Sequence, residues 1–287
     1  MSDLTRQNPI HVIGLASGSA VQLSAYSVLL LFIGGALFGA VAGDEPTGTD
    51  PLWMLVAFLA TIVTHELTHG LFFLVYGGRP SFGVGAVSRM VVYAYATASR
   101  PYTLTQFLVI GLSPFVLLSL ALLLIAVAFP TLAAYAAVGF IANFVGSVGD
   151  VWIASRIWRF RGAEALRLED RRDAVAVYAE GELALATAQR LAQRERRGSA
   201  WSRFLGAWLV AFALTLLLAI LAPVVLDAAA IRGDVRIGPE GFALVEYSAS
   251  SEGGFGATVS FAPAAIAGAA FAAIYTVLRK LAPSRRE

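Results

Sequence analysis

The chain alternates long apolar stretches with shorter polar ones. Six apolar stretches reach the length of about 20 residues that an α-helix needs to cross a bilayer. They run over Val21–Gly43, Leu52–Tyr76, Leu104–Phe129, Thr131–Ile157, Arg203–Leu226 and Pro263–Leu281. This pattern predicts an all-α integral membrane protein, folded as a bundle of about six transmembrane helices.

Shorter patterns predict the elements between the spans. Arg79–Tyr95 is rich in Gly, Val and Tyr and follows the second span directly. Its two runs of alternating apolar residues predict a short β-hairpin-like element, with the strands joined near Ser88 and Arg89. Ile231–Ala262 mixes apolar residues with Gly, Pro and Ser and predicts a few more short strands. Ala163–Arg197 contains Ala, Leu, Glu and Arg throughout, which predicts helix.

These elements divide the chain into three parts. Residues 1–157 are expected to form a membrane core with spans one to four. Residues 158–202 are expected to form a basic helical loop in the cytoplasm. Residues 203–287 are expected to form a two-span unit with an extracytoplasmic segment at 228–262.

Composition and charge support membrane residence and suggest an orientation. The chain is 58% hydrophobic and 14% charged, which excludes an ordinary soluble domain. The segment from Arg156 to Arg203 carries eleven of the 21 basic residues, whereas Asp44–Asp50 holds three acids and no base. Because basic loops favour the cytoplasmic side, we expect a multi-pass protein of the cell membrane with both termini in the cytoplasm. Membrane lipids are expected partners and nucleic acid is not.

The second span contains the pentamer His65-Glu66-Leu67-Thr68-His69. Two histidines four residues apart lie on one helical face, where both can bind one Zn²⁺. Glu66 beside them can act as general base toward a water that the metal activates. Ionisable residues inside a span are costly and therefore indicate function. The alternative is a pair of buried histidines satisfied by neighbouring helices.

Asp150 is the best candidate for a third metal ligand. The chain has no cysteine, and Asp150 is the only other acid well inside an apolar span once Glu66 is reserved as the base. His69 lies 18 residues after Pro51, and Asp150 lies 20 residues after Pro130. In parallel helices they reach similar depths, about 27 and 30 Å along the axis. The alternative is an acid that hydrogen-bonds to Ser or Asn across the bundle.

Asn143 and the charges of the site extend this prediction. Asn143 and Asp150 fall on one helical face, and we expect Asn143 to be a catalytic donor to a substrate carbonyl or its oxyanion. The alternative is an amide that only bridges helices. Zn²⁺ with the carboxylates of Asp150 and Glu66 sums to zero charge when His65 and His69 are neutral, which low-dielectric surroundings favour.

These residues carry a family resemblance. The HExxH helix, the Gly-rich segment after it and the later Asn143…Gly149-Asp150 resemble zincin-type integral membrane metallopeptidases, a group often described only as a domain of unknown function. The pattern is also similar to the site-2 protease class of intramembrane metalloproteases, although that class places its ligand aspartate in an Asp-Gly pair. The resemblance covers roughly Leu52–Ile157. It implies His65 and His69 as zinc ligands, Glu66 as catalytic base and Asp150 as third ligand.

The predicted function is that of a zinc-dependent, membrane-embedded metalloprotease that hydrolyses peptide bonds in or near the membrane. Its substrate would be a peptide or a membrane protein. Arg79–Tyr95 is interpreted as an edge strand that captures an extended substrate by β-addition, or otherwise as a connecting loop. One alternative is a non-proteolytic, metal-binding membrane scaffold or chaperone. Another is a metal transporter, against which the scarcity of polar residues in the spans argues.

Overall fold

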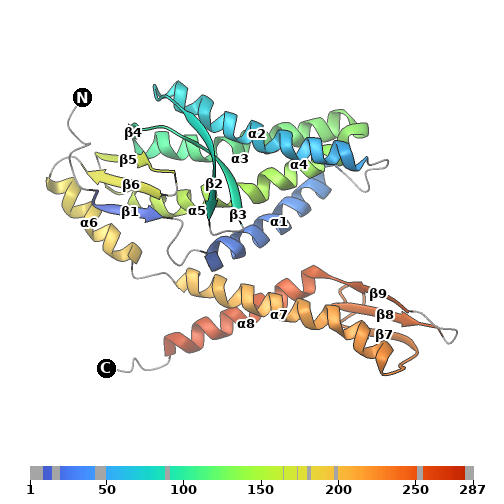
Figure 1. Cartoon of the computed structure of the whole chain (residues 1–287). Coiled ribbons are helices and arrows are strands. Elements are labelled where there is room, and N and C mark those ends of the chain that lie inside the picture. Colours follow the sequence, from blue (N-terminus) through green and yellow to red (C-terminus); the bar gives the residue numbers. More distant parts are fainter. Residues whose placement is uncertain are drawn as a thin grey trace. The chain divides into compact units, whose positions relative to one another are not determined.

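The computed structural model describes residues 9–14, 20–42, 50–87, 91–163, 165–172, 174–179, 182–196, 200–250 and 255–281. The chain forms two compact units, Met1–Arg197 and Gly198–Glu287, which are described separately (Figure 1). The structure is 67% helical, and six described helices are long and apolar enough to cross a membrane. These helices confirm the six long apolar helices that the sequence predicts. The all-α prediction needs correction, because three small sheets accompany the helices.

The first three spans of the first unit are α1 (Ala20–Ala42), α2 (Pro51–Val75) and α3 (Leu104–Ala128). Helices α2 and α3 begin at residues that favour helix starts. At the start of α2, Asp50 accepts the backbone N–H of Leu52 at 2.8 Å, and Pro51 occupies the first turn. At the start of α3, Thr103 and Gln106 form a reciprocal capping box. Local sequence thus fixes where α2 and α3 start.

The fourth span is bent in its middle. It consists of a short 3₁₀ turn η2 (Pro130–Leu132), α4 (Ala133–Gly146), α5 (Val148–Ile157) and a second turn η3 (Trp158–Phe160). The break falls at Ser147, whose Oγ donates to the carbonyl oxygen of Asn143 at 2.7 Å. Such back-bonding by serine commonly bends a helix. The bend separates Asn143 from Asp150.

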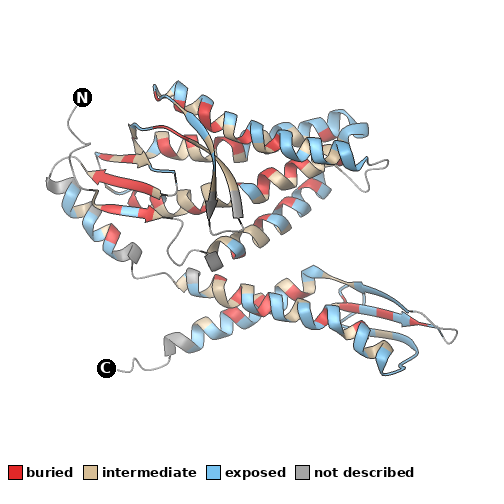
Figure 2. Cartoon of the chain, in the orientation of Figure 1, coloured by how far each residue is buried: buried red, intermediate tan, exposed pale blue. Residues whose placement is uncertain are grey.

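Helices α2 and α4 come very close together at Gly139. A Cβ atom at this position would lie 2.7 Å from Oγ1 of Thr61 on α2, so only glycine permits the approach. On the other side of α4, Phe140 packs against Phe38 of α1 with 5.4 Å between ring centroids. The outer faces of these helices expose large apolar side chains, as suits contact with lipid. Figure 2 colours the exposed residues of these helices pale blue.

Strands β2 (Ser81–Val87) and β3 (Val91–Thr97) form an antiparallel pair directly after α2. They confirm the predicted hairpin-like element, while the predicted joint at Ser88 and Arg89 lies outside the described residues. The ring of Phe82 lies against Gly70, the residue that follows His69. The hairpin is therefore held beside the HExxH turn.

A second sheet was not predicted. Its strand order is β1 (His11–Gly14), β6 (Ala174–Ala179), β5 (Leu166–Asp170) and β4 (Pro101–Tyr102). Figure 2 shows β6 largely in red, and its neighbours extend the same buried layer. The sheet packs with Phe73, Ile157 and Phe160 from the ends of the spans. The fold thus places a small sheet at one end of the helix bundle.

This sheet corrects the prediction of helix across Ala163–Arg197. Only α6 (Glu182–Arg196) is helical there, whereas residues 166–170 and 174–179 are strands. Leu166 and Leu168 are buried two residues apart, a strand period. Pairing with β1 and β4, which lie far away in the sequence, overrides the helical preference of the composition.

The second unit contains the last two spans and a three-stranded sheet. Helices α7 (Ala200–Ala228) and α8 (Phe261–Leu281) flank β7 (Gly233–Ile237), β8 (Val245–Ala249) and β9 (Phe255–Val259), which pair antiparallel in that order. The sheet confirms the strands predicted in Ile231–Ala262. Every second residue of β8 is buried, as expected for a sheet with one packed face.

Candidate metal centre

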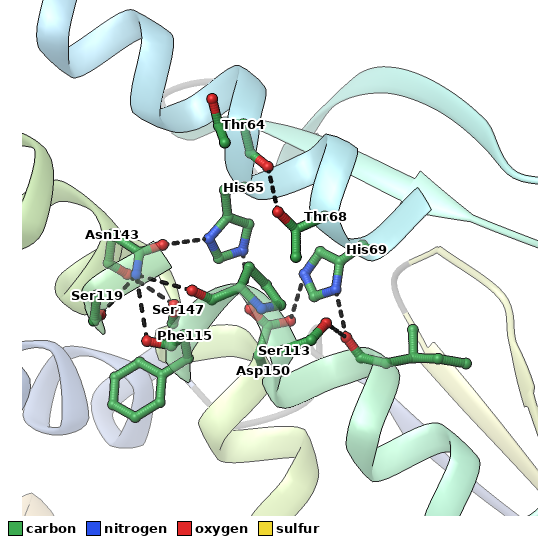
Figure 3. Close-up of polar contacts among 12 residues, drawn as sticks. Thr64, His65, Thr68, His69, Ser113, Phe115, Ser119, Asn143, Ser147 and Asp150 are labelled. Atoms are coloured by element: carbon green, nitrogen blue, oxygen red, sulfur yellow. Dashed lines mark hydrogen bonds and ion pairs between the residues drawn. The ribbon is translucent and has the colours of Figure 1, made fainter. Parts of the chain in front are cut away.

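His65, His69 and Asp150 come together in the first unit (Figure 3). The two histidines project from one face of α2, with 4.9 Å between their ring centroids. The Nε2 atoms of His65 and His69 lie 3.2 and 3.5 Å from carboxylate oxygens of Asp150 on α5. Both histidines are buried. The three residues that the sequence singled out as ligands therefore form one cluster.

The ring of His65 is oriented by Asn143. The amide nitrogen of Asn143 donates to the carbonyl oxygen of Pro114 at 3.2 Å and to Oγ of Ser119 at 2.9 Å. Its Oδ1 therefore faces His65, and Nδ1 of His65 donates to it at 2.8 Å. In the neutral ring Nδ1 then carries the single proton, and Nε2 presents a lone pair toward Asp150.

The ring of His69 is oriented by a backbone carbonyl that a proline has left unused. Pro114 lies inside α3 and has no N–H, so the carbonyl oxygen of Ile110 receives no helical bond from it. That oxygen accepts Nδ1–H of His69 at 2.9 Å and the hydroxyl of Ser113 at 2.9 Å. In the neutral ring Nε2 of His69 is then left with its lone pair, as in His65. A hydrogen bond from the ring nitrogen that does not bind the metal is typical of metal-binding histidines.

The donor set fits a tetrahedral cation such as Zn²⁺. Two Nε2 lone pairs and a carboxylate repel one another unless a cation lies between them. Ligand atoms on a tetrahedral zinc at about 2.0–2.1 Å are separated by about 3.3 Å. The observed separations of 3.2 and 3.5 Å lie close to that value. His65, His69 and Asp150 would supply three ligands and leave a fourth position open.

Glu66 occupies the position expected of a general base. It follows His65 on α2 and lines the same cavity as the three candidate ligands. The backbone N–H of Ala96 on β3 interacts with its carboxylate. Glu66 is thus beside the cluster without belonging to it.

The cavity has a volume of about 700 Å³. Its walls come from α1, α2, α3, α5, strand β3 and the turn between β5 and β6. His69 lies six residues before the end of α2, so the cluster is about 9 Å along the axis from that end. The site is therefore near one end of the bundle, the end that carries the four-stranded sheet.

The contacts of Asn143 bear on its predicted role as a catalytic donor. It is 2% exposed, and its amide hydrogens face acceptors within the protein. No amide hydrogen is left for a substrate oxyanion. The geometry therefore favours a residue that positions His65 and joins α3 to α4.

Sequence reasoning missed Asp170 as a residue of the cavity. It ends β5 and lines the cavity together with Glu66 and Asp150. Burial raises the pKa of the Asp170 carboxyl to about 6, although the backbone N–H of Arg172 and the hydroxyl of Thr97 oppose this shift. The sequence offered no signal for Asp170, because the four-stranded sheet that brings it back to the spans was not predicted.

The comparisons with known proteins agree with a zincin-like site. Residues 58–163 match the model of a family described as "Putative zincin peptidase". This stretch is a little over a third of the chain and includes His65, Glu66, His69, Asn143 and Asp150. No curated protein and no solved structure matches the chain. The family match supports a zincin-type peptidase, while the similarity to site-2 proteases stays a prediction.

Proposed function

We propose that the chain is a zinc-dependent, membrane-embedded metalloprotease that hydrolyses peptide bonds in or near the membrane. The observation that carries the proposal is the convergence of His65, His69 and Asp150, with Glu66 beside them in one cavity. Bound zinc would supply a Lewis acid that polarises a peptide carbonyl and acidifies water. The family match, which names a peptidase, supports the same reading.

The residues around the candidate metal site have separate roles in the proposed hydrolysis. The Glu66 carboxylate takes a proton from the attacking water and later gives it to the leaving amine. Asn143 and the Ile110 carbonyl hold the two imidazole rings so that both Nε2 atoms point to one place. Asp150 supplies the negative charge that, with Glu66, balances a divalent cation. These assignments give each buried polar group of the cluster a role.

Strand β3 is the candidate for binding the substrate backbone. Among the described residues β3 pairs only with β2, so its other edge is unpaired, and Tyr93 to Ala96 line the cavity. The N–H of Ala96 points to Glu66, and strand geometry directs the N–H of Ala94 to the same side. An extended substrate paired to this edge would present its peptide bonds next to Glu66.

The position of the site suits a substrate at the cytoplasmic membrane surface. The sheet at this end of the bundle carries Arg167, Arg171 and Arg172, and basic residues favour the cytoplasmic side. With that orientation both termini are cytoplasmic, and water reaches the cavity from the same side. Membrane lipids surround the apolar outer faces of the spans.

Glu66→Gln in the full-length protein tests the function. The variant should retain zinc but lose cleavage of casein or of a model transmembrane substrate by about 10³-fold or more, since the amide cannot accept the proton. The matched control is Glu246→Gln on β8 of the second unit, which should cleave like wild type. Equal cleavage by Glu66→Gln and wild type, or no cleavage by zinc-loaded wild type across a broad substrate panel, would refute the proposal.

A further inference from the structure

Asp170 is held at the wall of the cavity by its own turn. Its Oδ1 accepts the backbone N–H of Arg172 at 2.8 Å, and Arg172 adopts the left-handed conformation with φ of 70°. Aspartate commonly stabilises such turns in this way. The turn brings the carboxylate into the cavity lining together with Ala174 and Val175 of β6. This bond, together with the interaction of the carboxyl with the hydroxyl of Thr97, fixes where this acid points.

Asp170 has no cationic partner of its own. Among the residues that the structure describes, no basic nitrogen lies within 4.0 Å of its carboxylate. Of the two arginines that follow it, Arg171 directs its guanidinium to the hydroxyl of Tyr178 at 2.6 Å. Arg172 lines the cavity but places its guanidinium 5.7 Å from the ring centroid of Tyr95. Arg172 is also exposed, so water screens its charge. The Asp170 carboxylate is therefore desolvated without an ion-pair partner.

The charges of the candidate metal site do not compensate Asp170 either. A divalent cation with the carboxylates of Asp150 and Glu66 is already neutral. Asp170 adds one negative charge to a cavity with low-dielectric walls, where a cation from outside is bound more strongly than in water. A cationic group on the substrate is the natural complement.

We propose that Asp170 is a specificity-determining residue, which accepts an ammonium or guanidinium group of the substrate close to the scissile bond. The inference rests on the proposed peptidase function and names its substrate class. The cation is either a Lys or Arg side chain or a free α-amino group. A charge-assisted hydrogen bond to Asp170 holds that group and thereby places the neighbouring peptide bond beside Glu66.

The test uses the full-length protein in detergent and two matched variants. Asp170→Asn removes the charge but keeps an oxygen that can accept the N–H of Arg172, so the turn is retained. Glu169→Gln is the control, because Glu169 is adjacent on β5 but bonds to Tyr178 at 2.7 Å and does not line the cavity. The substrates are one peptide sequence with Lys, norleucine or Glu at a single position, each with a free or an acetylated N-terminus.

Wild type and Glu169→Gln should cleave the cationic peptides with a kcat/KM about 10- to 100-fold higher than the neutral ones. Asp170→Asn should reduce this preference to about one while cleaving neutral peptides normally. If acetylation removes the preference, the cation is the α-amino group; if norleucine removes it, the cation is the side chain.

Cleavage by wild type without charge preference, or a preference that Asp170→Asn retains, would overturn the role of Asp170 and leave the peptidase proposal standing. The wild-type series alone decides this point even if a variant does not fold. If wild type cleaves none of the peptides, the peptidase proposal fails. Fluorescence anisotropy with the same peptides then tests whether Asp170 recognises cationic groups. Binding selective for cations and dependent on Asp170 supports the recognition site, and equal binding overturns it.

Discussion

Helices α2 and α7 are spans of similar length, 25 and 29 residues, but they are built for different purposes. Helix α2 buries His65 and His69 and carries Glu66 between them. Helix α7 has no ionisable side chain between Arg203 and Asp227. Its close contact with α8 depends instead on Gly268, where a Cβ would lie 3.0 Å from the backbone nitrogen of Phe212.

This difference shows where polar groups inside a span are tolerated. In the first unit the imidazoles of His65 and His69 each have a hydrogen-bond acceptor from another span, Asn143 for His65 and the Ile110 carbonyl for His69. In the second unit Thr215 satisfies its hydroxyl within its own helix, by bonding the carbonyl oxygen of Ala211 at 2.8 Å. The first unit therefore concentrates the chemistry, and the second packs through small residues.

Among substitutions that leave the three candidate ligands in place, the largest effect on zinc affinity is expected at Asn143. Asn143→Leu leaves Nδ1 of His65 without its acceptor and should weaken zinc binding about 10- to 100-fold. Thr215→Val, a matched loss of a polar group in α7, should leave zinc affinity unchanged. Competition with a chromogenic chelator measures both. Equal affinities in the two variants would show that Asn143 does not position His65.

The charge of Asp170 predicts that the preference for cationic over neutral peptides depends on pH. Its pKa is raised to about 6, so the carboxylate is charged above that pH and neutral below it. The preference for cationic over neutral peptides should be full near pH 7.5 and fall about tenfold toward pH 5.

The charged and polar groups that act on Asp170 are His69, Asp150, Thr97 and the backbone of Arg172. Using the ratio of kcat/KM for two peptides at each pH cancels effects on the metal cluster, which both substrates share. A ratio that is constant from pH 5 to 7.5 would contradict the prediction.

A smaller effect on zinc affinity is expected from replacing Pro114, and Pro223 provides the control, because both prolines lie inside helices. Pro114→Ala supplies an N–H that competes with His69 for the carbonyl oxygen of Ile110, and zinc affinity should fall about threefold to tenfold. Pro223→Ala makes the same change inside α7 and should not affect zinc. The same chelator competition measures zinc affinity in both variants. Unchanged zinc affinity in Pro114→Ala would argue that the Ile110 carbonyl does not orient the ring of His69.

The smallest effect on the site is expected from the second unit. Gly268→Leu overpacks the contact between α8 and α7 and should destabilise it by about 1–3 kcal/mol. Zinc content should stay at the wild-type level. Gly39→Leu on α1 is the control, since nothing lies within 4 Å of its Cβ position. Protection of α7 amides from hydrogen exchange reports the packing, and loss of zinc in Gly268→Leu would contradict the separation of roles.

The spans, the hairpin and the cluster of His65, His69 and Asp150 could be predicted from sequence because their signals are local. Apolar length marks a span, and a spacing of four marks one helical face. The depth argument for Asp150 worked because α2 and the fourth span both begin at a proline, Pro51 and Pro130, on the same side of the bundle.

The four-stranded sheet could not be predicted in this way, because its strands come from three distant parts of the sequence. Leu166 and Leu168 gave a period of two, but the surrounding Ala, Glu and Arg favoured helix. Missing the sheet meant missing Asp170. The role of Asn143 depended on which acceptors its amide finds in α3, and a single helical face gives no information about a neighbouring helix.

The account depends on one divalent cation held between α2 and α5, and zinc content measures this most directly. Elemental analysis of purified full-length protein should give about one zinc per chain in wild type and in Glu66→Gln, and close to none in Asp150→Asn. Wild type without stoichiometric zinc after loading, or Asp150→Asn with as much zinc as wild type, would contradict the account.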